Sequence, residues 1–209
     1  VFDGYADWEP AHAVAELRRH GQYRVETVAL TREPVASMGG ISVLPSRTVD
    51  EVDPEDVAVF ILPGGDRWER APMERELQAL LKRFDEQETP IAAICGATVG
   101  ISKIGLLRGR RHTSNGLQYL QAHVRDYTEA ANYVDAPAVR DRHLITASGL
   151  GDVEFAPDHV IARAGVAAHV DLLDVDAAGV ARLSPAVRRQ QRVLSRAPAH
   201  RGRHPVPGL

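Results

Sequence analysis

The sequence has a single cysteine, Cys95, among its 209 residues, and no apolar run long enough for a membrane helix. One cysteine excludes an internal disulfide framework and is typical of a reducing compartment. A membrane helix needs about 20 consecutive apolar residues, and no basic stretch leads into an apolar one at the start. We therefore predict a cytoplasmic protein with no membrane partner.

Acidic residues are absent from the last part of the chain. Residues 184–209 contain six arginines and no aspartate or glutamate, whereas the whole chain has a net charge of -3. This tail also lacks aromatic residues that could stack on bases, so we predict a disordered, solvated segment and no nucleic-acid partner. Residues 1–183 are long enough for one sizeable core, and we predict a single domain there.

Apolar runs alternate with helical patterns along the first half of the chain. Residues 57–62 and 91–94 are continuously apolar, which is typical of parallel strands that are covered on both faces. Helical spacing is found from Asp7 to about His20 and from Met73 to Phe84. Strands separated by helices at this interval predict right-handed βαβ units, and therefore an α/β fold with a mostly parallel central sheet.

Further elements are predicted on both sides of this region. Residues 1–2 are apolar and run directly into an Asp-Gly turn signal at residues 3–4, as the end of a strand would, so the first strand is predicted to be truncated. Residues 23–30 alternate as a strand, and residues 35–44 predict a small hairpin or a bent pair of strands. Farther along, the patterns predict helices over residues 96–107, 117–123 and 153–164 and short strands over residues 110–114 and 144–147.

The sole cysteine stands where the apolar run at residues 91–94 ends. Ala93 and Ala97 flank Cys95 two residues away on each side, and small residues at these positions suit a nucleophile elbow, a sharp turn between strand and helix. A sulfur at a helix N-terminus is expected to favour the thiolate. On residue type alone, Cys95 could instead be a small buried apolar residue.

Three stretches in order and spacing resemble the PfpI-like family of the class I glutamine amidotransferase-like superfamily, which also holds the Parkinson-disease protein deglycase. They are residues 7–9 (Asp-Trp-Glu), residues 62–65 (Leu-Pro-Gly-Gly), and residues 93–97 (Ala-Ile-Cys-Gly-Ala) with the glycine- and arginine-rich segment up to residue 111. The resemblance covers about residues 1–164. It implies a flavodoxin-like three-layer sandwich and a homodimer.

The resemblance assigns roles to four residues. Cys95 falls on the nucleophile position, and Glu9 falls on the glutamate that approaches the sulfur and could shuttle its proton. The amides of Gly65 and Gly96 fall on the oxyanion hole. Without the resemblance, Glu9 would be a first-turn acid that favours the helix dipole, and Gly65 would belong to a simple turn after a strand.

The sequence departs from the family where a histidine would assist the cysteine. Gly96 follows Cys95, and the predicted strand after the elbow helix ends in Asn115. His112 lies three residues earlier, on the opposite face of a strand, so we interpret it as structural and keep Asn115 and His112 only as accessory candidates. The late His-x-Glu pair of glutamine amidotransferases is also missing, because residues 152–154 read Asp-Val-Glu, which argues against glutamine hydrolysis.

No histidine spacing suggests a metal site, and we predict neither a metal nor a cofactor. The leading hypothesis is a hydrolase- or lyase-like enzyme in which Cys95 attacks a small electrophilic substrate and Glu9 transfers the proton. A non-enzymatic redox sensor with an oxidisable Cys95 remains an alternative. A ligand-binding domain with a vestigial site is the third hypothesis.

Overall fold

The computed structural model describes residues 1–19, 23–149, 173–175 and 181–183. Its helices are α1 (Trp8–Arg19), η1 (Val49–Glu51), η2 (Pro54–Asp56), α2 (Arg67–Arg70), α3 (Arg75–Glu86), α4 (Gly96–Lys103), α5 (Leu117–His123) and η3 (Glu129–Asn132). Its strands are β1 (Val28–Ala29), β2 (Val35–Ala36), β3 (Ser42–Val43), β4 (Arg47–Thr48), β5 (Phe60–Leu62), β6 (Ile91–Ile94), β7 (Ala138–Asp141), β8 (Leu144–Ala147), β9 (Leu173–Val175) and β10 (Ala181–Leu183).

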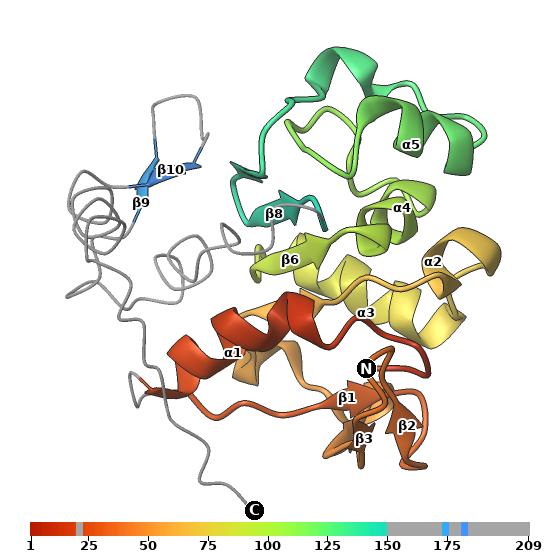
Figure 1. Ribbon diagram of the computed structural model, residues 1–209, viewed down its shortest axis with the longest axis vertical. Helices are drawn as coiled ribbons and strands as arrows, with labels where there is room; N and C mark the ends of the chain where they lie inside the picture. The colour runs from red at the N-terminus through yellow and green to blue at the C-terminus, as the bar shows by residue number, and fades with distance from the viewer. Residues whose placement is uncertain (20–22, 150–172, 176–180, 184–209) are drawn as a thin grey trace, which may run out of the picture.

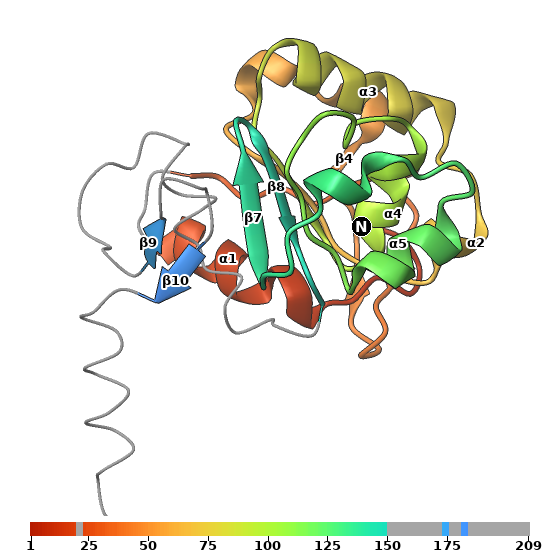
Figure 2. The same ribbon diagram turned by 90° about the horizontal axis from the view of Figure 1, so that it is seen from above.

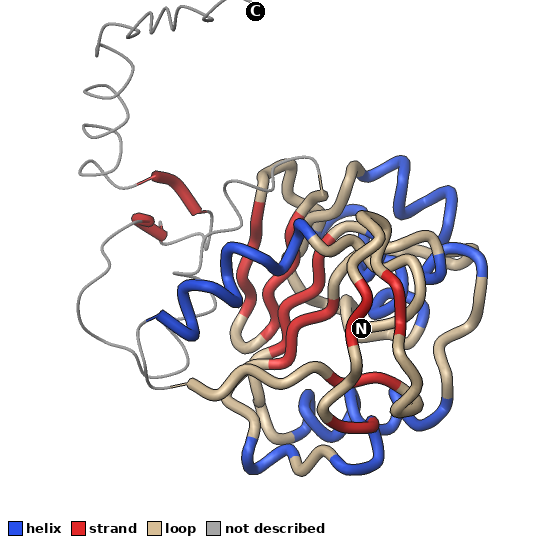
Figure 3. The backbone as a smooth tube through the Cα atoms, turned by 60° about the horizontal axis from the view of Figure 1, so that its bottom comes forward, coloured by secondary structure: helices blue, strands red, loops and turns tan. Residues whose placement is uncertain are grey.

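The central sheet has four strands in the order β5-β6-β8-β7, and its strands run side by side in Figure 3. β5, β6 and β8 are parallel, with Ile91 of β6 opposite Phe60 on one side and Leu144 on the other. β7 closes the far edge and pairs antiparallel to β8. The predicted mostly parallel sheet is therefore confirmed, and β1 and β4 form a separate parallel pair.

Two apolar clusters cover opposite faces of this sheet, because successive strand residues point to opposite sides. Ile91 and Ala93 belong to the cluster that includes α3 and α4, whereas Ala92 and Ile94 belong to the cluster that includes α1. In Figure 2, α1 and α3 accordingly lie on either side of β7 and β8. The predicted three-layer α/β arrangement is confirmed.

Local sequence patterns predicted several helices and strands correctly. The hairpin predicted over residues 35–44 is present as β2 and β3, with Val35 opposite Val43. The predicted helix at residues 117–123 coincides with α5, and α1 lies within the first predicted helix. Figure 1 also shows the sharp passage from β6 into α4, which confirms the predicted elbow.

Other predictions were too long. The strand predicted over residues 23–30 contains only the two residues of β1, which pair with β4. The helix predicted over residues 96–107 ends at Lys103, and Gly105 then adopts a φ of 85° that favours glycine. Residues 110–114 form no ladder, and a single bridge joins His112 to Tyr133. A strand needs a partner along its length, which alternation alone does not supply.

Two predictions lie outside the described residues. These are the helix over residues 153–164 and the tail of residues 184–209. Within the described part of the chain, no helix is both long and apolar enough to cross a membrane.

Candidate functional site

Cys95 lies at the strained turn between β6 and α4. Its φ of 55° and ψ of -123° are unusual for a residue with a side chain. The turn is held because the Cys95 amide donates to Ala147 O at 2.9 Å and the Thr98 hydroxyl donates to Cys95 O at 2.6 Å. Ala93 and Ala97 are fully buried beside it. The tight packing keeps the sulfur at the carboxyl edge of the sheet.

Glu9, in the first turn of α1, lies against Cys95. Its side chain is buried, with the residue 3% exposed, and the Gly64 amide donates to its Oε2 at 2.5 Å. A Cβ on Gly64 would come within 2.7 Å of both Glu9 carboxylate oxygens and 2.8 Å of the Cys95 Cβ. Only a glycine therefore fits between the carboxylate and the cysteine.

Gly149, two residues after the end of β8, also lies close to the sulfur. A Cβ at this position would lie 2.7 Å from the Cys95 Sγ and 3.1 Å from the Glu9 Oε1. The Gly149 amide donates to the Asn115 Oδ1 at 2.8 Å, and the Asn115 Nδ2 donates to the Cys95 Sγ at 3.1 Å. Asn115 is thus oriented by the backbone so that its amide group faces the sulfur.

The environment of Cys95 keeps its proton on the sulfur. Burial is the largest influence and raises the pKa of Cys95 to about 11. The negative charge of Glu9 raises this pKa further, whereas the hydrogen bonds from Asn115 and from the Gly96 amide lower it. The expectation of a favoured thiolate was wrong, because burial and the adjacent carboxylate outweigh the helix N-terminus.

The two glycines assigned to the oxyanion hole lie next to each other. A Cβ on Gly96 would come within 2.9 Å of the Gly65 carbonyl oxygen and 3.5 Å of the Gly65 nitrogen. Gly65 has a φ of 146°, and a side chain there would meet the Gly4 carbonyl oxygen and the Phe2 ring. The loop around Gly65 can therefore lie against the start of α4 only with glycine at these positions.

His112 is fully buried and is held by a different set of contacts. Its Nδ1 donates to Arg110 O at 2.7 Å, and its Nε2 accepts a hydrogen bond from the Tyr127 hydroxyl at 2.5 Å. Burial lowers the pKa of His112, which favours the neutral ring that these two bonds require. Both ring nitrogens are therefore occupied by groups other than Cys95.

A cluster that the sequence did not predict lies beyond Asn115. The Tyr119 hydroxyl donates to Glu69 Oε1 at 2.5 Å, and His123 Nε2 lies 3.4 Å from Glu69 Oε2. Burial, followed by Glu69, raises the pKa of Tyr119, whereas a hydrogen bond with Asn115 lowers it. Only the i, i+4 spacing of Tyr119 and His123 on one helix could have suggested a pair, since Glu69 is 50 residues away.

Comparison with known proteins agrees with this geometry. The sequence pattern of the DJ-1/PfpI family matches residues 1–161. The chain is 38% identical over 167 residues to the uncharacterized protease YoaZ of Bacillus subtilis, a match that covers 75% of this chain and 77% of that one. It is 27% identical over 153 residues to the deglycase TK1284 of Thermococcus kodakarensis, covering 72% and 88%.

A solved structure also resembles the fold. The DJ-1 superfamily protein Atu0886 of Agrobacterium tumefaciens superimposes with a TM-score of 0.73 at 28% identity, over 93% of this chain and 94% of that one.

Proposed function

Because the chain belongs to the DJ-1/PfpI family, we propose that it is a cysteine-dependent enzyme of hydrolase or lyase type that acts on small electrophilic substrates. The observation that carries this proposal is the placement of Glu9 against Cys95 at a strained elbow, with glycine at each point of closest approach. Strain of this kind is retained where it serves function. The related proteins named protease and deglycase agree with chemistry at an acyl or carbonyl carbon.

The first step is attack of the Cys95 sulfur on an electrophilic carbon. Since the pKa of Cys95 is raised to about 11, the thiol must lose its proton as the carbon–sulfur bond forms. The Glu9 carboxylate takes that proton, and the electron pair of the carbonyl bond moves to its oxygen. The amides of Gly65 and Gly96 stabilise the resulting oxyanion. Glu9 then returns the proton to the oxyanion or to the leaving group.

Before the attack, the pair of Cys95 and Glu9 holds one proton and one negative charge. Two adjacent negative charges would repel each other, so the thiolate forms only while Glu9 is protonated. This coupling makes the resting enzyme a neutral thiol beside a carboxylate. Slow alkylation of the free thiol and fast reaction with a bound electrophile are then compatible.

Crowding around the sulfur supports a small substrate. Gly64 and Gly149 both lie so close to Cys95 that neither could carry a methyl group without displacement. Asn115 occupies a further side of the sulfur through its hydrogen bond. We therefore expect a small aldehyde, amide or nitrile to reach the sulfur more readily than a long or branched peptide.

Asn115 and Tyr119 are proposed as positioning residues. Asn115 holds the sulfur through its Nδ2, and Tyr119 links Asn115 to the Glu69 carboxylate. Tyr119→Phe removes the hydroxyl and keeps the ring, so we expect kcat to fall about tenfold with a shift of the pH–rate profile. A change in KM alone, with kcat and the profile unchanged, would remove Tyr119 from the mechanism.

The test is turnover of small electrophiles by matched variants. Hydrolysis or conversion of a panel of small aldehydes, activated esters and amides is measured for the wild type, Cys95→Ser and Glu9→Gln. We expect no turnover by Cys95→Ser and a loss of at least about 100-fold for Glu9→Gln, with circular dichroism unchanged. Turnover retained by Cys95→Ser would rule out the nucleophile.

Redox sensing is a weaker alternative for the same thiol. Oxidation by peroxide follows thiolate character, and the raised pKa of Cys95 opposes it. Intact mass after mild peroxide treatment separates the two functions. Rapid, clean addition of two oxygens at Cys95 in a protein without turnover would favour the sensor.

A homodimer is proposed from the surface near the site. Met38, Ile41 and Leu44 of the β2–β3 hairpin region and Trp8 of α1 are large apolar side chains that are 44 to 69% exposed. The hairpin contacts the start of α1, since the Gly39 amide donates to Asp7 Oδ1 at 3.0 Å. Analytical ultracentrifugation of the wild type and Leu44→Lys tests whether this surface joins two copies. A wild-type monomer would refute the dimer.

A further inference from the structure

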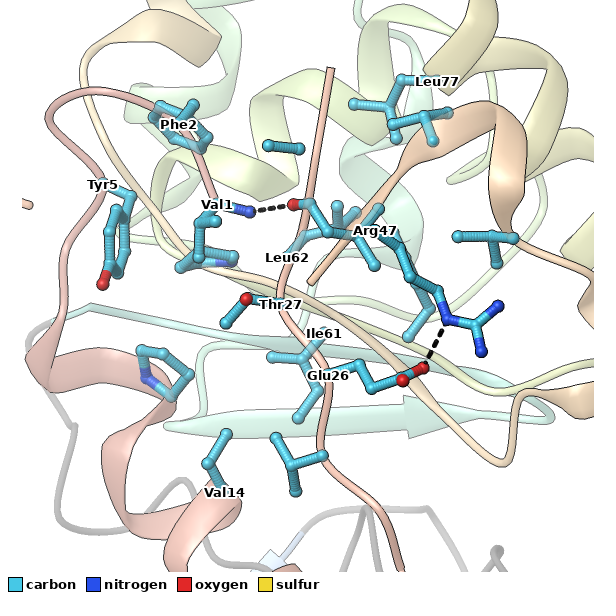
Figure 4. Close-up of a pocket in the computed structure, with 18 of the residues that line it drawn as sticks. Val1, Phe2, Tyr5, Val14, Glu26, Thr27, Arg47, Ile61, Leu62 and Leu77 are labelled. Atoms are coloured by element: carbon cyan, nitrogen blue, oxygen red, sulfur yellow. Dashed lines mark hydrogen bonds and ion pairs between the residues drawn. The ribbon is translucent and has the colours of Figure 1, made fainter. Parts of the chain in front are cut away.

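A second group of titratable side chains adjoins the candidate site on α2 and α5. It consists of Glu69, Tyr119 and His123, which contact one another. None of the three lines the apolar cavity of about 720 Å³ between α1, β1 and β5, where Figure 4 shows Val14 of α1 and Ile61 of β5. The three residues therefore bear on the candidate site and not on the cavity.

A continuous series of hydrogen bonds joins Glu69 to the cysteine sulfur. The Tyr119 hydroxyl donates to Glu69 Oε1 at 2.5 Å, which leaves its oxygen to act as an acceptor. Burial and the Glu69 contact raise the pKa of Tyr119, whereas its hydrogen bond with Asn115 lowers it, as a bond that Asn115 donates to the phenol oxygen would. The same amide group donates to Cys95 Sγ at 3.1 Å. Glu69 therefore governs how Tyr119 engages the amide that holds the sulfur.

The ring of His123 is oriented so that one nitrogen faces Glu69. Its Nδ1 lies 2.9 Å from the Tyr119 carbonyl oxygen, which can only accept, so Nδ1 carries a hydrogen. Its Nε2 lies 3.4 Å from Glu69 Oε2. In the neutral ring Nε2 presents a lone pair to the carboxylate, whereas in the imidazolium it presents a donor. A single proton therefore converts an unfavourable contact into an ion pair.

The groups around His123 come from three helices. Glu69 of α2 carries the negative charge, and Tyr119 of α5 packs its ring 4.6 Å from the imidazole. Lys103 of α4 donates through its ammonium to the carbonyl oxygens of Trp68 and Glu69, at 2.7 and 3.0 Å, and so holds the backbone of α2. The side chains of His123 and Glu69 are 31% and 27% exposed, so the imidazole can exchange its proton directly with water.

The negative charge of Glu69 opposes formation of the Cys95 thiolate in two ways. Cys95 and Tyr119 are close enough for their charges to interact, so the charge next to Tyr119 also disfavours a charge on the sulfur. In addition, a phenol oxygen polarised by the carboxylate competes with the sulfur for the Asn115 amide. An imidazolium at His123 would cancel the first effect and weaken the second.

We propose that Glu69 and His123 are positioning residues that make Cys95 more reactive when the His123 imidazole is protonated. Histidine is the side chain whose ordinary change of charge lies between pH 5 and pH 8, so the thiolate is favoured at the acid end of this range. This regulation rests on the proposed function, in which Cys95 is the reacting group. Direct labelling of the thiol tests it without any turnover, so the two proposals can fail separately.

The test is the rate of modification of Cys95 by methyl methanethiosulfonate, a small uncharged reagent, from pH 5 to pH 8. Because the chain has one cysteine, intact mass reports this site alone. The variants are His123→Gln, Glu69→Gln and the matched control His12→Gln, which replaces an exposed histidine of α1. A thiol that titrates alone reacts about 1000-fold faster at pH 8 than at pH 5. We expect about 300-fold for the wild type and the control, and about 1000-fold for His123→Gln.

The two site variants should differ from the wild type at opposite ends of the range. We expect His123→Gln to react about threefold more slowly at pH 5 and equally at pH 8, and Glu69→Gln to react about threefold faster at pH 8. A merely structural contact would change the rate by the same factor at every pH. Parallel profiles of the wild type and His123→Gln would overturn the proposal, and so would a wild-type rate at pH 8 in Glu69→Gln.

Discussion

Two strands with the same kind of apolar sequence are buried to different extents. Residues 91–94 and residues 57–62 are both continuous apolar runs, yet the first is fully buried and most of the second is only partly buried. Among the described strands, β6 has a parallel neighbour on each side, whereas β5 has one. The elbow side is therefore closed around Cys95, and the side of β1 and β5 contains a cavity. An apolar run becomes a sealed strand only where both neighbours are present.

The largest difference is expected when one isoleucine is truncated on each side. Ile94 is fully buried and Ile61 partly buried, and both belong to the cluster beneath α1. Ile94→Ala should lower the free energy of unfolding by about 3 kcal/mol and Ile61→Ala by about 1 kcal/mol. Urea denaturation measures both. Equal losses would mean that the two sides are packed alike.

Adding a methyl group to a glycine is expected to reduce activity when the glycine lies beside Cys95, and to leave activity unchanged when it lies in the β2–β3 hairpin. Gly149→Ala places a carbon 2.7 Å from the Cys95 sulfur, and a displacement of about 1 Å at a reacting atom can reduce kcat/KM about 100-fold. Gly39→Ala is the control, because the atoms nearest to its Cβ belong to the end of the flexible Asp7 side chain. Initial rates with the best small electrophile give both values. Full activity in Gly149→Ala would contradict the close approach.

The sequence predicted the elbow well because its signals are local. A strand, one strained residue and small neighbours lie within ten positions around Cys95, and the placement of Glu9 beside Cys95 follows from the resemblance. The cluster of Tyr119 and Glu69 could not be found this way, because its members meet only through the fold. Neither could the protonation state of Cys95, since burial of the sulfur is not visible in sequence.

The β1 side was predicted less well for the same reason. Alternation over residues 23–30 indicates a strand, but the ladder extends only over the two residues that meet β4. Sequence also selected Gly65 of the Pro-Gly-Gly turn, whereas the adjacent Gly64 supplies the amide that binds Glu9. Consecutive amides point in different directions, and only the folded loop determines which one faces the carboxylate.

A more moderate effect is expected on the titration of the thiol. Burial has the largest effect on the pKa of Cys95 and raises it. The hydrogen bond from Asn115 lowers this pKa, and the charge of Glu9 raises it. Glu9→Gln should therefore move the alkylation midpoint down from about 11, and Asn115→Leu should move it up. The pH dependence of iodoacetamide labelling measures both shifts. Shifts in the same direction would show that one partner acts through packing alone.

The smallest effect is expected on the pH dependence of stability, through the Val1 ammonium. The pKa of the Val1 ammonium is lowered from 8.0 to about 6, so the folded state favours the neutral amine. Its contribution to stability is present above pH 8 and is lost as the pH falls through 6. We expect a loss of about 1 kcal/mol, because Val1 is only partly buried and solvent screens its charge.

N-terminal acetylation separates this contribution from every other titrating group. It replaces the ammonium by an amide, so the acetylated chain should lose less stability between pH 8 and pH 6 than the free chain does. Cys95 does not interfere, because its pKa of about 11 lies above this range. Urea denaturation of both forms at the two pH values gives the difference directly. Identical losses would show that the Val1 ammonium is fully hydrated and contributes nothing to this pH dependence.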